Sequence, residues 1–189
     1  MKRYNKSEKL ISIAANLISR KGYDGVSLQE IANKVGIHKS TLFHYIKSKA
    51  DLFSQVFGKS IYDANDKLER LCVDGSLQPE QKLKKAIENH LTDMIRYFDY
   101  TNIFLYQLRS LSAKDREMAL IERRKYEKNF EKIIAGMKTK GHFKRLDTQI
   151  TTFGLLGMLN WVPRWFRSDG RMSIKEISSM FYKLIVEKR

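Results

Sequence analysis

SLQEIANKVGIHKSTLFHYIKSKADLF, residues 27–53, is the stretch that decides the fold. Its first half places Ile31, Ala32 and Val35 at the spacing of one helical face. Gly36 then permits a tight turn that β-carbon crowding would otherwise disfavour. Residues 38–49 combine basic, imidazole and hydroxyl side chains, which suit phosphate oxygens and base edges. Two short helices joined by a glycine turn, the second polar and basic on its outer face, predict a helix-turn-helix motif.

Helix starts around this stretch are indicated by capping residues. A hydroxyl or amide side chain followed three residues later by an acid can satisfy the first unpaired N–H groups of a helix. This spacing is found in the pairs Asn5 and Glu8, Ser27 and Glu30, Ser48 and Asp51, Ser112 and Asp115, and Ser173 and Glu176. It predicts a first helix that ends near residue 20 and a longer helix from residue 48 to about residue 71.

The remaining two thirds of the chain also carry a helical pattern. Residues 72–81, with Gly75 and Pro79 as helix breakers, read as a linker. Apolar residues then recur at helical spacing to residue 137, and two further helices are expected over residues 146–166 and 174–187. Pro163 lacks an N–H group, so an irregularity is expected there. The sequence predicts an all-α fold of about nine helices, with a three-helix head in residues 1–50 and a larger body in residues 51–189.

The positive charge is concentrated in the head. The whole chain carries a net charge of +15, and residues 1–50 hold ten Lys or Arg against three acids, which gives +7. The other 139 residues carry +8, so the charge per residue is more than twofold higher in the head. This distribution favours a nucleic-acid partner for the head. A basic helical adaptor that binds RNA or a membrane surface is the alternative.

Cysteine and hydropathy restrict the class of protein. A single cysteine, Cys72, cannot form an internal disulfide framework or a cysteine metal site. No hydrophobic signal segment opens the chain, and the longest charge-free run, residues 148–163, is shorter than a bilayer crossing needs. We therefore expect a cytoplasmic protein with no membrane partner.

The head resembles a known family. Residues 27–53 strongly resemble the DNA-binding signature of TetR-family repressors, in which T/S-x-x-x-I-A-x-x-x-G-V leads into K-x-T-L-Y-x-x-F-x-x-K-x-x-L, and the match extends over residues 5–57. The resemblance implies an all-helical homodimer that grips a palindromic operator and binds a small molecule in its C-terminal body. The sequence departs from the signature at Phe43, Ile46 and His38. The first two keep an apolar plug, whereas histidine is a poorer helix cap than the usual serine.

Seven residues of the head are candidate DNA contacts. Lys39, Ser40 and Thr41 lie at the start of the expected recognition helix, the part that reaches base edges. Phosphate contacts are expected from the remaining four, which are Ser27, His44, Tyr45 and Lys49. The alternative is structural: Ser27 is only a cap, Tyr45 packs into the head and Lys49 is solvated.

A second informative stretch is LLGMLNWVPRWFRSDGRMS, residues 155–173. Asn160, Arg164 and Arg167 follow helical spacing on one face, and Trp161 and Trp165 lie on the neighbouring strip. The pattern resembles G-x-L-N-W-x-x-R-W-F/Y-R-x-x-G-x-[LM]-S of the FadR-type branch, TetR-family regulators released from DNA by acyl-CoA thioesters. The resemblance implies that these five residues either support the dimer or meet the polar end of the thioester. Apolar residues proposed for an acyl tunnel are Phe98, Phe104, Leu108 and Met158.

The last two helices are also the expected dimer seam. Gly154 and Gly157 are small residues that allow another helix to approach closely, and Ile177, Phe181 and Leu184 form an apolar stripe on the last helix. A four-helix bundle made from two helices of each protomer is therefore expected. The alternative is that residues 155–173 only pack within the protein.

Enzymatic readings find little support in the sequence. The four histidines, His38, His44, His90 and His142, show no metal-ligand spacing, and no nucleophile motif or phosphate-cradling loop occurs. We expect no catalysis, metal or cofactor. A regulator of efflux or stress genes that responds to another amphipathic or aromatic molecule is a further alternative. For a cationic ligand it would need buried carboxylates, for which Asp93 and Asp99 are the main candidates.

Overall fold

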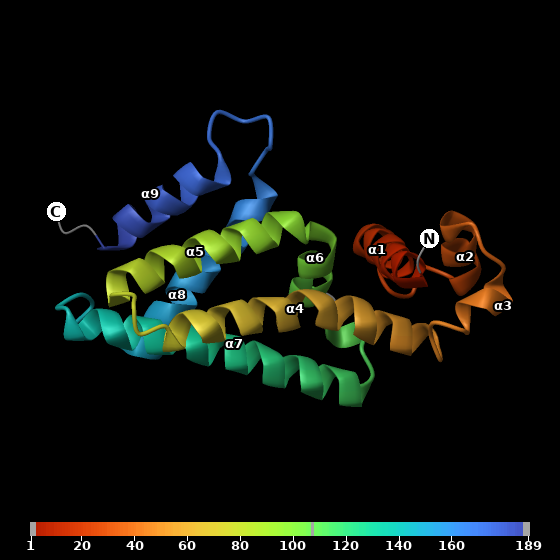
Figure 1. Cartoon of the computed structure of the whole chain (residues 1–189), viewed down its shortest axis with the longest axis horizontal. Helices are drawn as coiled ribbons and strands as arrows, with labels where there is room; N and C mark the ends of the chain where they lie inside the picture. The colour runs from red at the N-terminus through yellow and green to blue at the C-terminus, as the bar shows by residue number, and fades with distance from the viewer. Residues whose placement is uncertain (1–2, 107, 187–189) are drawn as a thin grey trace. The chain divides into compact units, whose positions relative to one another are not determined.

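The computed structural model describes residues 3–106 and 108–186, and over these residues helices, joined by turns and loops, are the regular secondary structure (Figure 1). The nine α-helices are α1 (Arg3–Lys21), α2 (Leu28–Val35), α3 (Lys39–Leu42), α4 (Lys49–Val73), α5 (Pro79–Arg96), α6 (Phe98–Tyr106), α7 (Ala113–Thr139), α8 (Thr148–Trp161) and α9 (Ile174–Val186). Two short 3₁₀ helices are η1 (Leu108–Ser110) and η2 (Val162–Arg164). The predicted all-α class and helix number are confirmed.

The chain folds as two compact units. Unit 1 comprises residues 1–62 and 97–121, and unit 2 comprises residues 63–96 and 122–189. Both α4 and α7 contribute to each unit. The boundaries of the compact units therefore lie after residues 62, 96 and 121 and not at residue 50, because residues 97–121 pack with the head. The functional division at residue 50 stays a prediction.

Unit 1 is built on α1. Its buried face carries Leu10, Ala14 and Ile18, each at most 1% exposed. The helix contacts both α2 and α6. Two hydrogen bonds fix α6, since Asn16 Nδ2 donates to Asp99 Oδ2 at 2.9 Å and Asn102 Nδ2 donates to Ser19 Oγ at 3.1 Å. Each of these bonds joins two residues that are 83 positions apart in the sequence.

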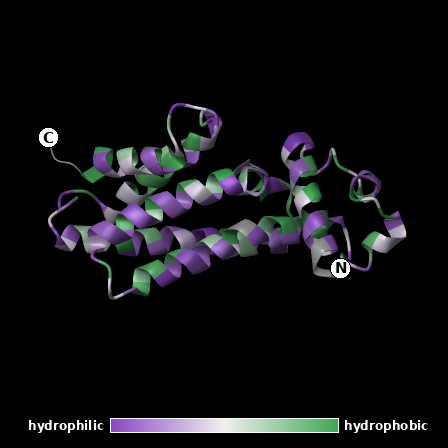
Figure 2. Ribbon diagram, turned by 45° about the horizontal axis from the view of Figure 1, so that its top comes forward, coloured by the Kyte–Doolittle hydropathy of each residue, from purple (hydrophilic) through white to green (hydrophobic). Residues whose placement is uncertain are grey.

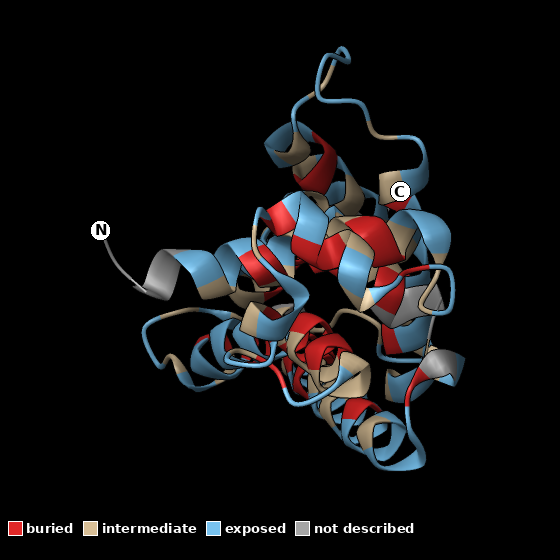
Figure 3. Cartoon of the chain, turned by 90° about the vertical axis from the view of Figure 1, so that its right-hand side faces the viewer, coloured by how far each residue is buried: buried red, intermediate tan, exposed pale blue. Residues whose placement is uncertain are grey.

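Unit 2 has its own hydrophobic core, in which α5 contacts α8 and α9. The inward faces of its helices hold the buried side chains, whereas the segment between η2 and α9 is largely exposed (Figure 3). Hydrophobic and hydrophilic residues are mixed along the long helices (Figure 2). The buried core residues of unit 2 include Leu68, Leu83, Ile87, Leu91, Phe130, Ile134, Leu155, Leu159, Val162 and Ile177. No described helix is long and apolar enough to cross a membrane.

Several capping predictions are confirmed. The Oγ atoms of Ser27, Ser48 and Ser112 accept the backbone N–H three residues later at 3.0–3.2 Å. Ser173 and Glu176 form a reciprocal box, because Ser173 N–H also donates to Glu176 Oε2 at 2.7 Å. Asn5 is different: α1 begins at Arg3, so Asn5 lies within the helix and the predicted cap is wrong.

Two helices are shorter than predicted. The α-helix expected within residues 38–49 spans only Lys39–Leu42, and turns follow, in which Tyr45 N–H donates to the Leu42 carbonyl at 2.8 Å. α8 ends at Trp161, and Pro163 lies in η2 rather than in a continued α-helix. The irregularity expected at Pro163 is therefore present, since proline supplies no N–H group to the helix.

Candidate functional site

The turn between α2 and α3 is fixed by a glycine. Gly36 has φ 82° and ψ 39°, a left-handed conformation that residues with a Cβ rarely adopt. Its N–H donates to the carbonyls of Ala32 and Asn33 at 3.0 and 3.2 Å, and Ile37 N–H donates to Ala32 at 3.0 Å. These bonds satisfy the last carbonyls of α2 and reverse the chain into the recognition segment. The helix-turn-helix predicted from the sequence is formed.

The recognition segment, residues 37–46, has one buried and one exposed face. Leu42 is fully buried and Ile46 is 3% exposed, so both anchor the segment to the head. Lys39, Ser40 and His44 are exposed. The segment therefore presents cationic, hydroxyl and imidazole groups to the outside.

The burial of three further residues of this segment differs from that expected of two exposed DNA contacts and one buried aromatic residue. Thr41 and Tyr45 are half-buried, and they pack partly into the head. Phe43 is 51% exposed, so the expectation that it forms an apolar plug is wrong. Leu42 and Ile46 already occupy the inward positions of this short turn, which leaves Phe43 on the outside.

Close to the recognition segment, a lysine and two aromatic side chains stack on one another. Lys49 Nζ lies 4.3 Å from the centre of the Tyr23 ring, which packs on Phe53 with ring centres 4.8 Å apart. Burial, followed by the charges of Asp24 and Asp115, raises the pKa of Tyr23. Lys49 is thus half-buried and held at the edge of the head by a cation–π contact.

The other head residues form a helix cap at Ser27 and two ion pairs. Ser27 is exposed and its hydroxyl accepts from Glu30 N–H, so it is a helix cap. His38 makes no side-chain cap bond. Two of the three acids before residue 50 are paired with lysines, Glu30 with Lys21 at 2.6 Å and Glu8 with Lys59 at 3.7 Å. Residues 37–46 themselves contain Lys39 and no acid, so the exposed recognition face is positively charged.

Unit 2 contains a polar network that crosses its core. His90 of α5 lies 2.9 Å from the Tyr126 hydroxyl of α7 through Nδ1, and 3.2 Å from Asn160 Oδ1 of α8 through Nε2. Since the amide oxygen can only accept, Nε2 carries the proton and Nδ1 accepts from Tyr126. Burial lowers the pKa of His90 to about 4, although the bond to Asn160 opposes this shift. Burial also raises the pKa of Tyr126, with a smaller contribution from Asp93. The network is therefore neutral.

The candidate ligand residues are brought together only in part. Asn160 faces His90 in the core, whereas the Arg164 guanidinium stacks on the exposed Trp161 ring at 4.9 Å. Trp165 and Arg167 line a pocket beside α9, and Met158 is 38% exposed. Phe98 and Leu108 belong to unit 1, where Phe98 is 48% exposed. The side chain of Phe104 lies outside the described residues.

The predicted dimer residues form an exposed apolar stripe on α8. Beyond the adjacent residues and the backbone of α8 itself, nothing lies within 4 Å of a Cβ added at Gly154 or Gly157. The stripe continues through large exposed side chains, which are Ile150, Phe153, Met158 and Trp161. On α9, Leu184 is 72% exposed, Phe181 is half-buried, and Ile177 is only 6% exposed and belongs to the core. Ile177 can therefore offer little surface to a second protomer.

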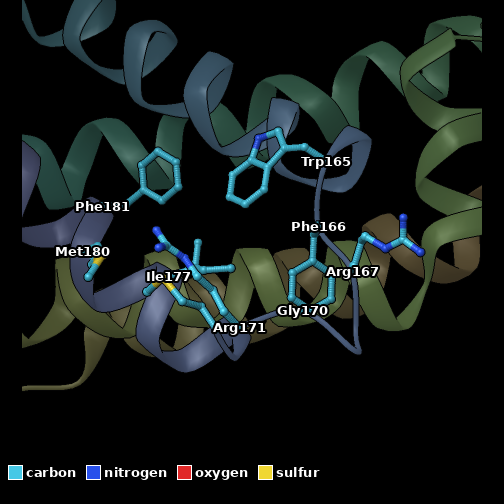
Figure 4. Close-up of a pocket in the computed structure, with 9 residues that line it drawn as sticks. Trp165, Phe166, Arg167, Gly170, Arg171, Ile177, Met180 and Phe181 are labelled. Carbon is cyan, nitrogen blue, oxygen red and sulfur yellow. The ribbon is translucent and has the colours of Figure 1, made fainter.

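Some residues of these regions were missed by sequence reasoning. His90 could have been found, because it lies on the apolar stripe of α5 beside Ile87, Leu91 and Met94. Phe166, Arg171 and Met172 line a pocket together with residues of α9 (Figure 4), and no local sequence pattern indicates this arrangement. Among the described residues, no group of three or more His, Cys, Asp or Glu side chains could hold a metal ion.

Two protein families match the sequence. Residues 10–56 match "Bacterial regulatory proteins, tetR family", and residues 76–188 match "Tetracyclin repressor-like, C-terminal domain". The chain is 21% identical over 186 residues to the HTH-type transcriptional repressor KstR2 of Mycobacterium tuberculosis, covering 94% of this chain and 89% of that protein. It is 27% identical over 134 residues to the biofilm operon negative transcriptional regulator IcaR of Staphylococcus epidermidis, covering 52% and 72%.

Solved structures show the same fold. The TetR-family regulator PfmR from Thermus thermophilus superposes with a TM-score of 0.84 at 26% identity, covering 94% of this chain and 96% of that one. AibR, solved in complex with isovaleryl coenzyme A and operator DNA, superposes with a TM-score of 0.84 at 23% identity, covering 96% and 98%. The chain therefore belongs to the tetR family of bacterial regulatory proteins, and its relatives KstR2 and IcaR are transcriptional regulators, not enzymes.

Proposed function

We propose that the protein is a transcriptional repressor that binds a palindromic DNA operator as a homodimer and is released by a fatty acyl-CoA or related thioester. The observation that carries the DNA-binding part is the recognition segment. Leu42 and Ile46 anchor it, while Lys39, Ser40 and His44 remain exposed in a head with a net charge of +7. Lysine can neutralise phosphates, an imidazole N–H can donate a hydrogen bond to them, and short hydroxyl side chains can reach base edges.

Homodimer formation is supported by the apolar stripe of α8. Isolated exposed apolar residues are common, but Ile150, Phe153, Met158 and Trp161 follow helical spacing around Gly154 and Gly157. A contiguous apolar stripe in a charged chain favours an interface. A symmetric dimer also presents two recognition segments, which matches the two half-sites of a palindrome.

The effector proposal rests on the chemistry of residues 160–167. Arginine binds phosphate through paired hydrogen bonds, and an exposed tryptophan can stack on a purine. Arg164, Trp165 and Arg167 are exposed, whereas the exposed Trp161 belongs to the stripe proposed for the dimer. The similar fold of AibR, which was solved with isovaleryl coenzyme A and operator DNA, adds support. In this proposal Asn160 acts indirectly, by tying α8 to His90.

A cationic effector finds less support. Asp93 accepts two hydrogen bonds from Lys67 at 2.6 and 2.8 Å, and Asp99 accepts from Asn16 at 2.9 Å. Both carboxylates already have partners, so neither is poised for a cationic ligand. An effector of another amphipathic or aromatic class, regulating efflux or stress genes, is the second candidate.

Release from DNA requires that the effector binds the DNA-incompetent arrangement more tightly. Typical allosteric coupling of about 1–3 kcal/mol would weaken operator binding about 5- to 150-fold. The proposed link is α4, which begins three residues after Ile46 and continues as one helix to Val73. A small tilt of this helix would change the spacing of the two recognition segments.

Two experiments test the proposal. Selection from a randomised duplex library should enrich an inverted repeat, and the absence of any enriched palindrome would contradict operator binding. Isothermal calorimetry with CoA thioesters of graded chain length should then detect binding that Arg164→Ala weakens while operator affinity is retained. If no thioester produces heat, or if Arg164→Ala and Arg167→Ala respond like the parent, the acyl-CoA effector is wrong and the repressor remains.

A further inference from the structure

A small pocket of about 130 Å³ lies in unit 2, where the end of α4, the start of α5 and the second half of α7 meet (Figure 1). Among the described residues, none that line it belong to α8, η2 or α9. The surface proposed for the second protomer and residues 160–167 therefore take no part in it. Its lining includes Cys72, Leu77, Pro79, Lys82, Lys132 and Gly136.

The lack of a side chain at Gly136 keeps this space open. Gly136 lies inside α7, although glycine is a poor helix former. A Cβ at this position would lie 3.5 Å from Pro79 Cβ, so a longer side chain would fill part of the pocket. A water molecule takes up about 30 Å³ in the liquid, and ligand pockets for larger molecules enclose about 300–1,000 Å³. The space therefore suits an ion of the size of phosphate and not a long apolar chain.

Two lysines bring positive charge to the pocket. Lys82 Nζ donates to the carbonyl oxygen of Cys72 at 2.6 Å, and Lys132 Nζ donates to Asn129 Oδ1 at 3.0 Å. An ammonium group has three N–H donors, so both lysines keep donors for a further acceptor. Within residues 3–106 and 108–186, neither lysine forms an ion pair with an acid. Two positive charges thus line the same small space.

The acids that lie within electrostatic reach of this pocket have other partners. Glu69 lies 3.0 Å from Lys125 Nζ, with which it forms an ion pair. Asp74 accepts a hydrogen bond from the backbone N–H of Ser76 at 2.9 Å. Neither carboxylate contacts Lys82 or Lys132 within the described chain. The charges of the two lysines are therefore left without a contacting acid.

The thiol and a buried amide at the pocket add no negative charge. Burial raises the pKa of Cys72, and the charges of Lys132 and Lys82 oppose this shift only in part, so the thiol is protonated at neutral pH. Its Sγ donates to the backbone carbonyl of Asn129 at 3.3 Å. Asn129 is 3% exposed, and its Nδ2 has no acceptor among the described residues. Since buried amide N–H groups rarely lack a partner, an unused donor lies beside the Lys132 ammonium.

We propose that this pocket binds a phosphate-sized tetrahedral oxyanion between the ammonium groups of Lys82 and Lys132. Hydrogen bonds from charged donors to anionic oxygens are stronger than neutral ones, and phosphate offers several acceptor oxygens at once. The ligand is inorganic phosphate or the phosphate group of a small ester. Its binding requires neither operator DNA nor the effector, so it goes beyond the proposed function.

Cys72 is the only cysteine of the chain, so its reactivity reports whether the pocket is occupied. The full chain is alkylated with iodoacetamide and followed by intact mass. Added phosphate should slow alkylation saturably by at least about fivefold, because the ion covers Sγ and its charge disfavours the reactive thiolate. Potassium chloride of equal ionic strength should change the rate less than about twofold. Methyl phosphate in a parallel titration distinguishes an ester from the free ion.

Substitutions of two lysines on α7 test the charge. Lys132→Gln removes the ammonium group but keeps an N–H donor for Asn129 Oδ1, so protection should require at least about tenfold more phosphate. Lys132→Arg keeps the charge and should retain protection. Lys128→Gln is the matched control, because Lys128 is exposed, lies one turn earlier on α7 and does not line the pocket. Equilibrium dialysis with radiolabelled phosphate should show saturable retention in the parent that is lost in Lys132→Gln.

Three alkylation results would overturn the inference. These are a rate that phosphate does not change, an equal decrease with potassium chloride, and equal loss of protection in Lys132→Gln and Lys128→Gln. Slower alkylation without phosphate retained in dialysis would assign the effect to the thiol alone and also overturns it. Operator selection and calorimetry with CoA thioesters are separate measurements, so failure of the proposed function leaves this result intact.

Discussion

The Nε2 atom of His90 lies 3.2 Å from Oδ1 of Asn160, so the amide of Asn160 points into the core of unit 2. Helical spacing had placed Asn160 and Arg164 on one face, but α8 ends at Trp161 and the chain continues as η2. Arg164 consequently stacks on Trp161 at the surface. Two residues of a single sequence motif thus have separate roles, one in the core and one outside.

The His90 network should make stability depend on pH. Burial lowers the pKa of His90 from 6.5 to about 4, so the unfolded chain binds a proton more readily than the folded one between these values. The stabilising contribution is complete above about pH 6.5 and is lost as the pH falls toward 4, by about 3 kcal/mol in total. Urea unfolding at pH 7 and pH 4.5 should show a smaller loss in His90→Gln than in the parent. Equal losses in both proteins would contradict this account.

Gly36 should be intolerant of a Cβ although space is available. Beyond the adjacent residues, nothing lies within 4 Å of an added Cβ at Gly36 or at Gly75, but of these two glycines only Gly36 has a positive φ. Gly36→Ala should therefore lower the free energy of unfolding by about 1–2 kcal/mol. Gly75→Ala is the matched control and should be neutral or stabilising by less than about 1 kcal/mol. Thermal unfolding measures both, and equal destabilisation would show that the backbone conformation is not the cause.

Residues of the recognition segment should separate into two classes. His44→Ala and Lys49→Ala should weaken binding to all duplexes about equally and reduce its salt dependence, because they remove phosphate contacts. Thr41→Ala should relax base preference at one position of each half-site, at about 1–3 kcal/mol per lost base contact. Fluorescence anisotropy with single-position duplex variants distinguishes the classes. A uniform loss in Thr41→Ala would place Thr41 among the phosphate contacts.

The seam on α8 should be sensitive to bulk at Gly157. Since nothing beyond the adjacent residues and the backbone of its own helix lies within 4 Å of an added Cβ, Gly157→Trp should fold as the parent does. It should nevertheless be monomeric by light scattering and should lose operator binding. Ala135→Trp, at an exposed position of α7, is the control and should remain dimeric. A fully dimeric Gly157→Trp protein with parental DNA affinity would move the seam elsewhere.

The head could be predicted well because its signals are local. Ser27, Gly36 and the apolar spacing of Ile31, Val35 and Leu42 determine caps, turn and buried face within about 16 residues. The exposure of Phe43 could not be predicted from residue spacing, because the segment leaves the α-helix after Leu42. Beyond that point helical spacing no longer tells which side chain faces the core.

The division into compact units and the ligand region required tertiary information. The bond between Asn16 and Asp99 joins residues 83 positions apart, and no periodic pattern encodes such a pairing. Likewise, Arg171 and Phe181 line one pocket only because residues 165–172 pack beside α9. The sequence could propose an arginine and tryptophan cluster, but it could not decide which members would share a pocket.

The central claim is sequence-specific DNA binding by a symmetric dimer. It is tested most directly by the anisotropy of three labelled duplexes, namely the palindrome obtained by selection, a single half-site and a scrambled duplex of equal composition. The account predicts one dimer on the palindrome with an affinity roughly 10³-fold or more above the scrambled duplex, and weaker binding to the half-site. Equal affinity for the palindrome and the scrambled duplex would contradict it.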